Sequence, residues 1–253
     1  METVSHINIQ DGVHVSGPTR QHFSDFETHY ISVRNKEKRV LSISEIQQLP
    51  YPDITNANYN EWKLRKKSIE RFLHYLRKKK MPLRILDIGC GNGFMTHLMA
   101  GENNEAVGVD VNLTELKQAA IAFPGKNLKW YYLDILNETL PEKPFDIITF
   151  GASFQYFKDA KQILDTCKNR LSKAGEIHII DSPFYSENSK LNAKENSKHY
   201  FNKMGVEHMN NYYNHHSYSV FTNYNVEILY DPNSMINKLF RRSNSPFPWI
   251  KII

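Results

Sequence analysis

The middle of the chain reads Ile85-Leu86-Asp87-Ile88-Gly89-Cys90-Gly91-Asn92-Gly93-Phe94, where an apolar run meets a cluster of glycines. The apolar residues 83–88 predict a buried strand. Helical spacing begins directly afterwards with Phe94, Leu98 and Met99. Glycine lacks a Cβ atom, so this turn can bring the backbone close to a ligand. A strand that ends in a glycine turn and leads into a helix predicts a site for a nucleotide-like cofactor.

On the carboxyl side of this turn, strands and helices are expected to alternate. Apolar runs predict strands over residues 83–88, 106–110, 128–133, 145–150 and 176–180. Periodic segments predict helices over residues 93–100, 113–123 and 159–171. Asn112 is the expected N-cap of the second helix, with Glu115 completing a capping box, and Gly175 is the expected C-cap of the third. This alternation implies a parallel sheet with right-handed crossovers, closed by two strands over 226–230 and 249–253.

The two flanks of this region carry weaker signals. Residues 1–55 are predicted to form an N-terminal extension that packs over the mouth of the following domain, residues 56–253. Within the extension, Val13 and Val15 suggest a short strand, and residues 22–39 have helix-like spacing. Residues 56–80 predict one long helix with an apolar stripe. In the C-terminal third, residues 184–218 are predicted to form a polar, mobile lid that includes a short helix over 206–213.

Composition restricts the class of protein. The chain has 253 residues, 40% of them hydrophobic, which is enough for a core. No apolar run approaches the roughly 20 residues that span a bilayer, and the first residues do not resemble a secretion signal. Cys90 and Cys167 are not expected to form a disulfide, which fits a reducing cytoplasm. No Cys/His spacing predicts a metal site.

The formal net charge is +5, and much of the basic excess lies in the long helix. These basic residues are Lys63, Arg65, Lys66, Lys67, Arg71, Arg77, Lys78, Lys79 and Lys80. The mixed signs elsewhere favour a solvated helix face. A docking patch for RNA or protein over residues 63–80 is the alternative.

The chain resembles the class I S-adenosylmethionine-dependent methyltransferases. Asp87–Gly93 match that family's acidic-x-Gly-x-Gly-x-Gly signature. The resemblance covers residues 83–181 and continues through Val109-Asp110, Leu133-Asp134, 145–148 and 171–176. It is closest to small-molecule methyltransferases of the ubiquinone and menaquinone biosynthesis type. It implies a Rossmann-like α/β fold with a seven-stranded, mostly parallel sheet, helices on both faces, an antiparallel last strand and an N-terminal helical extension.

Two details separate this signature from a dinucleotide-binding one. A dinucleotide fingerprint needs Gly-x-Gly-x-x-Gly, and its last position here is Phe94. S-adenosylmethionine has no phosphate and carries an ammonium and a sulfonium, so the carboxylate of Asp87 suits it. The expected cofactor is S-adenosylmethionine, with S-adenosylhomocysteine as the product.

The resemblance gives the turn and the strand ends separate roles toward the cofactor. Gly89, Gly91 and Gly93, with Cys90 and Asn92 between them, allow close backbone approach. Asp87 is expected to orient the methionine ammonium, or to cap the turn. Asp110 is expected to accept hydrogen bonds from the ribose hydroxyls, or to cap the next helix.

Further along, the resemblance places Asp134 as the acceptor for the adenine amino group, with a surface loop acid as the alternative. Val111 and Ile135 would flank the adenine. Gly151 would face the methionine amine through its carbonyl, next to Tyr156.

Candidates for a general base are few. His215, His216, Tyr156 and Tyr185 lie after strand ends or in an aromatic stretch, where ordinary packing is an equal alternative. We expect methyl transfer to a small-molecule acceptor. The alternatives are an RNA or protein methyltransferase, a cofactor-binding protein without turnover, and a nicotinamide-dependent oxidoreductase.

Overall fold

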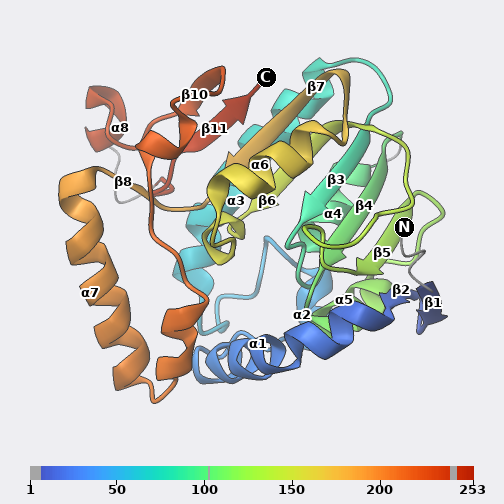
Figure 1. The fold of residues 1–253 in the computed structure, drawn as a ribbon, viewed down its shortest axis with the longest axis horizontal. Coiled ribbons are helices and arrows are strands. Elements are labelled where there is room, and N and C mark those ends of the chain that lie inside the picture. Colours follow the sequence, from blue (N-terminus) through green and yellow to red (C-terminus); the bar gives the residue numbers. More distant parts are fainter. Residues whose placement is uncertain (1–6, 102, 240–243) are drawn as a thin grey trace.

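A computed structural model describes residues 7–101, 103–239 and 244–253. In the described part of the chain, a central sheet of nine strands has the order β1-β2-β5-β4-β3-β6-β7-β11-β10 (Figure 1). Its strands are β1 (Ile7–Gln10), β2 (Val13–Ser16), β3 (Arg84–Ile88), β4 (Glu105–Asp110), β5 (Leu128–Tyr132), β6 (Phe145–Gly151), β7 (Leu171–Ile180), β10 (Val226–Tyr230) and β11 (Trp249–Ile252). The strands from β2 to β7 in this order pair in parallel, whereas β1, β10 and β11 pair antiparallel.

Helices cover both faces of this sheet. They are α1 (Gly17–Lys36), α2 (Ile43–Gln47), α3 (Tyr59–Lys78), α4 (Phe94–Ala100), α5 (Leu113–Ala122), α6 (Ala160–Lys168), α7 (Glu187–Lys203) and α8 (Met235–Leu239). Short 3-10 turns are η1 (Phe154–Tyr156), η2 (Glu207–Asn211) and η3 (Tyr218–Phe221), and β8 (Phe184–Tyr185) pairs in parallel with β9 (His216–Ser217). One hydrophobic cluster packs α3, α4 and α5 against the sheet, and a second packs α6 on the opposite face. The predicted α/β class, with helices on both faces, is confirmed.

The sheet is wider than the seven strands expected, because the N-terminal segment adds two. Val13 and Val15 are buried and pair with Trp130 and Tyr132 of β5. β1 and β2 form a hairpin whose turn is Asp11-Gly12, with positive φ at both positions. Asp-Gly is a common hairpin signal. None of the residues of β1 is buried, however, so this strand lacks the buried apolar face that would predict it. The domain boundary predicted at residue 55 stays a prediction.

One helix end and one cap differ from the prediction. The helix expected over 159–171 ends at Lys168, and Leu171 begins β7 instead. Gly175 is therefore not a C-cap; it lies in the irregular start of β7. A Cβ atom there would lie 2.9 Å from the carbonyl oxygen of Phe145, so glycine allows the two backbones to approach. Asn112 does cap α5, accepting from the Glu115 amide at 3.1 Å, but the Glu115 carboxylate turns toward Arg34.

The segment predicted as a polar, mobile lid contains a regular helix. α7 begins with a capping box between Ser186 and Ser189 and buries little besides Phe201. No apolar stripe predicts this helix because most residues of α7 are polar. In Figure 1, α7 stands to the side of the sheet, and α1 runs along its lower edge.

The basic helix uses much of its charge within the molecule. The Arg71 guanidinium lies 4.0 Å from the Tyr230 ring, and Lys79 Nζ lies 2.7 Å from Glu176 Oε1. Lys66 lies over Tyr51. These contacts argue against α3 as a free docking patch. None of the helices in the described residues has the length and apolar character needed to cross a membrane.

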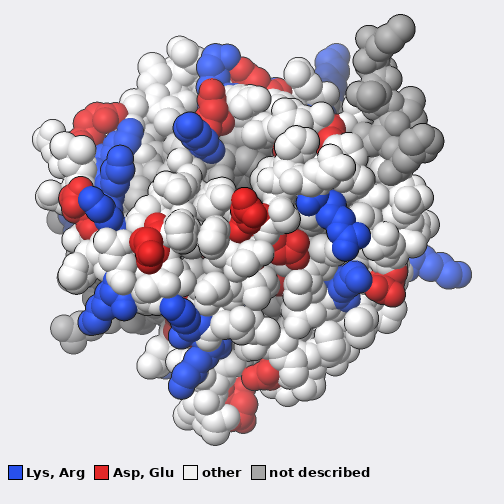
Figure 2. Space-filling model, turned by 60° about the horizontal axis from the view of Figure 1, so that its bottom comes forward, with Lys and Arg blue, Asp and Glu red and all other residues white. Residues whose placement is uncertain are grey.

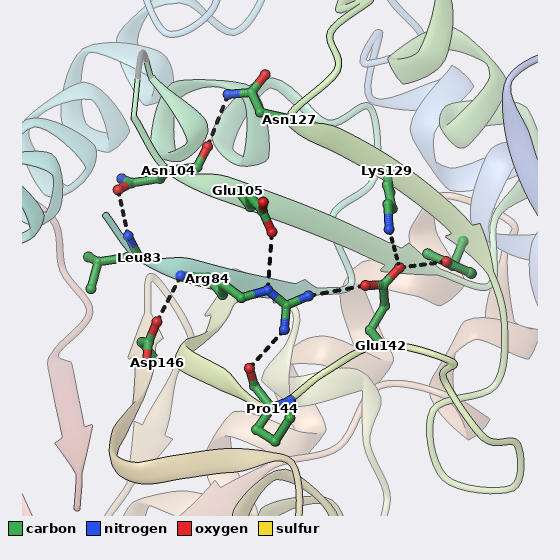
Figure 3. A network of polar contacts seen from close by, with 10 residues as sticks. Leu83, Arg84, Asn104, Glu105, Asn127, Lys129, Glu142, Pro144 and Asp146 are labelled. Atoms are coloured by element: carbon green, nitrogen blue, oxygen red, sulfur yellow. Dashed lines mark hydrogen bonds and ion pairs between the residues drawn. The ribbon is translucent and has the colours of Figure 1, made fainter. Parts of the chain in front are cut away.

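At the amino ends of the strands, a polar network links β3, β4, β5 and β6 (Figure 3). The Glu142 side chain is only 6% exposed, and it accepts hydrogen bonds from Arg84 Nη2 at 3.1 Å, Lys129 Nζ at 2.8 Å and Tyr131 Oη at 2.8 Å. The Arg84 side chain also reaches Glu105, whose carboxylate is largely exposed. Glu142 is therefore the centre of the network.

We expect Glu142→Gln to lower the free energy of unfolding by about 1–2 kcal/mol, since it removes the charge from these hydrogen bonds. Urea unfolding measures the change. Glu105→Gln is the matched control and should cost less than about 1 kcal/mol, because its pair with Arg84 is exposed. Equal losses for the two variants would show that Glu142 is not the centre of the network.

Candidate functional site

A cavity of about 850 Å³ opens at the carboxyl ends of the parallel strands. Its lining takes residues from the end of β3, β4, β6 and β7 and from the loop after β5, together with α1, α3, η2 and α7. Carboxyl ends of strands are where ligands bind in sheets of this type. The structure thus brings the predicted N-terminal extension, the predicted lid and the glycine turn to one cavity.

The glycines of the turn differ in what they do. Gly89, Gly91 and Gly93 all have positive φ values, which favour glycine. Gly89 and Gly91 line the cavity, together with Cys90 and Asn92. Gly93 does not belong to the cavity lining. A Cβ atom on Gly93 would lie 2.5 Å from the Trp130 ring and 2.6 Å from Ala119 Cβ, so this glycine lets α4 pack on β5.

Asp87 lines the cavity but is almost completely buried. Its carboxylate accepts hydrogen bonds from Thr96 Oγ1 at 2.6 Å and Thr149 Oγ1 at 3.0 Å. Burial raises the pKa of Asp87 to about 6. The predicted turn cap is not observed, since both carboxylate bonds go to side chains.

Asp110 holds the glycine turn and the start of α5. Its Oδ2 accepts from the Gly91 amide at 2.7 Å, and its Oδ1 accepts from the Asn112 amide at 2.9 Å. Burial, helped by the charge of Glu115, raises the pKa of Asp110 to about 7. Each oxygen keeps a second lone pair, so the carboxylate can hold the turn and also accept from a ligand in the cavity.

Asp134 is occupied within its own loop. Its Oδ1 accepts from the Leu136 amide at 3.0 Å, and its Oδ2 accepts from Asn137 Nδ2 at 2.6 Å. It lines the cavity together with Ile135 and Val111. The structure therefore brings together the three residues expected at the adenine.

Gly151 ends β6 beside the glycine turn. It lines the cavity, and a Cβ atom on it would lie 2.7 Å from Met95 Sδ. The next residue, Ala152, has a positive φ of 58°, which turns the chain sharply into η1. The missing side chain at Gly151 thus makes room for Met95 at the edge of the cavity.

Tyr156 belongs to a group of rings that forms one wall of the cavity. We name this group the aromatic cluster: Phe26, Tyr30, Tyr156, Phe201, Tyr212 and Tyr213. Ring centroids of Phe26 and Tyr212 lie 5.2 Å apart, and those of Tyr30 and Tyr156 lie 5.7 Å apart. Burial raises the pKa of Tyr156 to about 12, so its hydroxyl stays protonated at neutral pH.

The other candidate bases lie outside the described cavity lining. His216 is buried, and its Nε2 lies 2.9 Å from the Phe157 carbonyl oxygen. His215 Nε2 lies 2.9 Å from Ser197 Oγ, and the His215 ring packs on Tyr185. Burial lowers the pKa of both histidines. Ser197 lines the cavity, but these three candidates sit behind that lining.

Sequence reasoning missed a set of charged residues in the cavity. Arg39 binds Glu61 with two guanidinium nitrogens, and Arg34 Nε lies 3.6 Å from Glu115 Oε1. Arg65 lies over the Trp62 ring at 4.7 Å. On the face drawn in Figure 2, some acidic side chains lie near the middle, and Lys, Arg and further acidic side chains lie around them. No local motif marks these residues, since α1 and α3 bring them together only in the folded chain.

Comparison with known proteins points to the same family as the glycine signature. A family model described as a methyltransferase domain matches residues 79–240. An uncharacterized methyltransferase of Mycobacterium bovis, Mb0092, is 24% identical over 96 residues, which are 38% of this chain and 49% of that protein. A ubiquinone biosynthesis O-methyltransferase of Idiomarina loihiensis is 30% identical over 97 residues, 37% of this chain and 40% of that protein. The chain thus spans half or less of the length of these curated relatives.

Solved structures share the architecture. The plantazolicin methyltransferase BpumL, solved with SAH, has a TM-score of 0.54 and 18% identity over 93% of this chain and 99% of its own. At that identity the likeness shows the fold alone. The family model, by contrast, covers more than half of the chain and includes the glycine turn, Asp110 and the cavity edge. The chain belongs to the class I S-adenosylmethionine-dependent methyltransferases, as its glycine signature predicted.

Proposed function

We propose that this chain transfers the methyl group of S-adenosylmethionine to a small-molecule acceptor. The observation that carries the proposal is the single cavity at the carboxyl strand ends, which joins the glycine turn and Asp110 to the aromatic cluster. One end suits the cofactor and the other suits an acceptor. Residues of α1, α7 and η2 enclose the second end, which favours a small acceptor over a polymer.

The residues of the first end fit the cofactor. At Gly91 a Cβ atom would point toward Glu115 Oε2, 3.1 Å away, so the absence of a side chain keeps this part of the cavity open. Asp110 would accept from the ribose hydroxyls, and Val111 and Ile135 would flank the adenine. Asp87 would favour the methionine ammonium through its charge. When bound, the cofactor supplies an electrophilic methyl group on a sulfonium.

The protein itself would position the acceptor against the methyl group and exclude water from the two. Residues 1–55 and 184–218 would form the cap over the acceptor. BpumL, which shares the fold, was solved together with SAH and a pentazolic desmethylPZN analog. We take a small organic acceptor, rather than RNA, as the substrate class because residues of α1, α7 and η2 enclose the acceptor end of the cavity.

Calorimetry tests the cofactor directly. We expect S-adenosylhomocysteine to bind the purified chain and NAD not to bind. Release of methyl label from S-adenosyl-[methyl-³H]methionine into small acceptors would then establish turnover. Binding of NAD without S-adenosylhomocysteine would overturn the proposal, and cofactor affinity without transfer to any acceptor would favour a protein without turnover.

Cofactor affinity should depend on pH through Asp110. The pKa of this carboxyl is about 7 in the ligand-free chain, and its ionised form is the better acceptor for two hydroxyls. Affinity for S-adenosylhomocysteine should therefore fall as the pH drops below about 7. Calorimetry between about pH 5.5 and 8.5 measures this slope. Asp110→Asn should flatten it, and an unchanged slope in that variant would assign the titration to another group.

A further inference from the structure

Gln155 carries an acceptor atom that lacks a partner. It lies in η1, directly after the end of β6, and it lines the cavity although only 6% of it is exposed. Its Oε1 has no hydrogen-bond partner among the described residues. A buried carbonyl oxygen without a donor costs about 1–3 kcal/mol, so such an atom points to a ligand that donates.

The orientation of this amide is set by its other end. Gln155 Nε2 donates to the Ala152 carbonyl oxygen at 2.7 Å. The exchanged orientation would place two acceptor oxygens against each other, so Oε1 is the free atom. The Gln155 backbone carbonyl in turn accepts from the Asn214 amide at 2.8 Å. The residue is thus held at both its side chain and its backbone.

The nearby basic groups do not favour an anionic acceptor. The Nε atoms of Arg34, Arg39 and Arg65, which also line the cavity, lack a hydrogen-bond partner among the described residues as well. The charges of these guanidinium groups are, however, already faced by carboxylates, Asp181 and Glu61 in the case of Arg65. Arg39 is bound by Glu61, and Arg34 faces Glu115. A carboxylate acceptor would compete with these carboxylates and would offer no N–H or O–H to Gln155. A carboxylate acceptor would therefore leave Gln155 Oε1 without a hydrogen-bond donor.

An alcohol fits less well than an amine. An O–H donated to an amide oxygen keeps its proton there, because an amide does not act as a base. The described cavity lining contains no histidine, and Tyr156 stays protonated. Two carboxylates of the lining are already engaged: Asp181 accepts from Ser68 and Ser245, and Glu37 accepts from Tyr200. A primary or secondary amine can donate one N–H to Gln155 and keep its lone pair free for attack.

We infer that the acceptor is a primary or secondary amine on an aromatic or apolar scaffold, with its N–H bound by Gln155 Oε1 and its scaffold packed on the aromatic cluster. This inference rests on the proposed function. The neutral amine forms the new N–C bond as the C–S bond breaks, and the electron pair of that bond stays on sulfur as a thioether. The product ammonium then loses its extra proton to water.

Three probes with one scaffold test the inference: phenethylamine, phenethyl alcohol and phenylacetate. Each is titrated by NMR into the chain saturated with S-adenosylhomocysteine, at a pH of about 9 where part of the amine is neutral. We expect the amine to bind about threefold to tenfold more tightly than phenylacetate, which has no donor for Gln155. With S-adenosyl-[methyl-³H]methionine in place of the product, we expect label to reach the amine and not the alcohol, so the amine is preferred in binding over the acid and in transfer over the alcohol. Gln155→Met should remove that preference and change the affinity for S-adenosylhomocysteine by less than about twofold.

Gln118→Met is the matched control. Gln118 also donates from Nε2 to a backbone carbonyl, that of Leu41 at 2.8 Å, but it lies outside the described cavity lining. This variant should keep the preference for the amine. If Gln155→Met does not fold, the ranking of the three probes on the unmodified chain still tests the amine assignment.

The amine assignment is overturned by methyl transfer to the alcohol or the acid as fast as to the amine, by equal or tighter binding of the acid, by no binding of any probe, or by a preference that Gln155→Met leaves intact. Failure of S-adenosylhomocysteine itself to bind would instead overturn the proposed function. The two failures are therefore distinct.

Discussion

Gly93→Ala should lower the free energy of unfolding by about 2–5 kcal/mol. The backbone at Gly93 has φ of 75°, and an L-residue there costs roughly 1–2 kcal/mol. The added Cβ atom would also lie 2.5 Å from the Trp130 ring, and overpacking of this kind costs about 1–3 kcal/mol. Trp130 is buried in the middle of β5, so its ring cannot move into solvent.

Urea unfolding measures this loss, and Gly17→Ala is the control. Gly17 begins α1, and a Cβ atom there would meet nothing within 4 Å. Its replacement should change stability by less than about 0.5 kcal/mol. A Gly93→Ala variant as stable as this control would show that the contact with Trp130 does not restrict the site.

Asp110→Ala should weaken cofactor binding by about 1.5–3 kcal/mol, which is roughly tenfold to 150-fold in affinity. The variant removes the proposed ribose acceptor. It also releases the Gly91 and Asn112 amides, which Asp110 holds at 2.7 and 2.9 Å, so the turn loses part of its preorganised shape. Calorimetry with S-adenosylhomocysteine measures the change.

Asp146→Ala is the matched control for this loss. Asp146 also accepts from a backbone amide, that of Arg84 at 2.9 Å, but it lies in the network at the amino ends of the strands (Figure 3). Its replacement should lower stability and leave cofactor affinity unchanged. Unchanged affinity in Asp110→Ala would mean that another group accepts from the ribose.

The residues of the proposed cofactor end could be predicted from the sequence, and much of the rest could not. Asp87 is next to last in the apolar run of β3, and Asp110 and Asp134 come at the ends of apolar runs, so their places near the strand ends come from local patterns. The predicted bases His215 and His216 had no such anchor, and they lie behind the cavity lining. Gly93 shows the same limit within the signature itself, since its partner Trp130 is distant in sequence.

The sequence by itself determined the α/β alternation and the family, because strand and helix periods and a glycine turn are properties of neighbouring residues. Only the tertiary structure brought together the residues of the proposed acceptor end. Arg34, Arg65, Gln155 and the aromatic cluster come from segments far apart in the chain, and no local pattern links them. The physical reason is that an acceptor site is a surface made by packing, whereas the cofactor turn is made by consecutive residues.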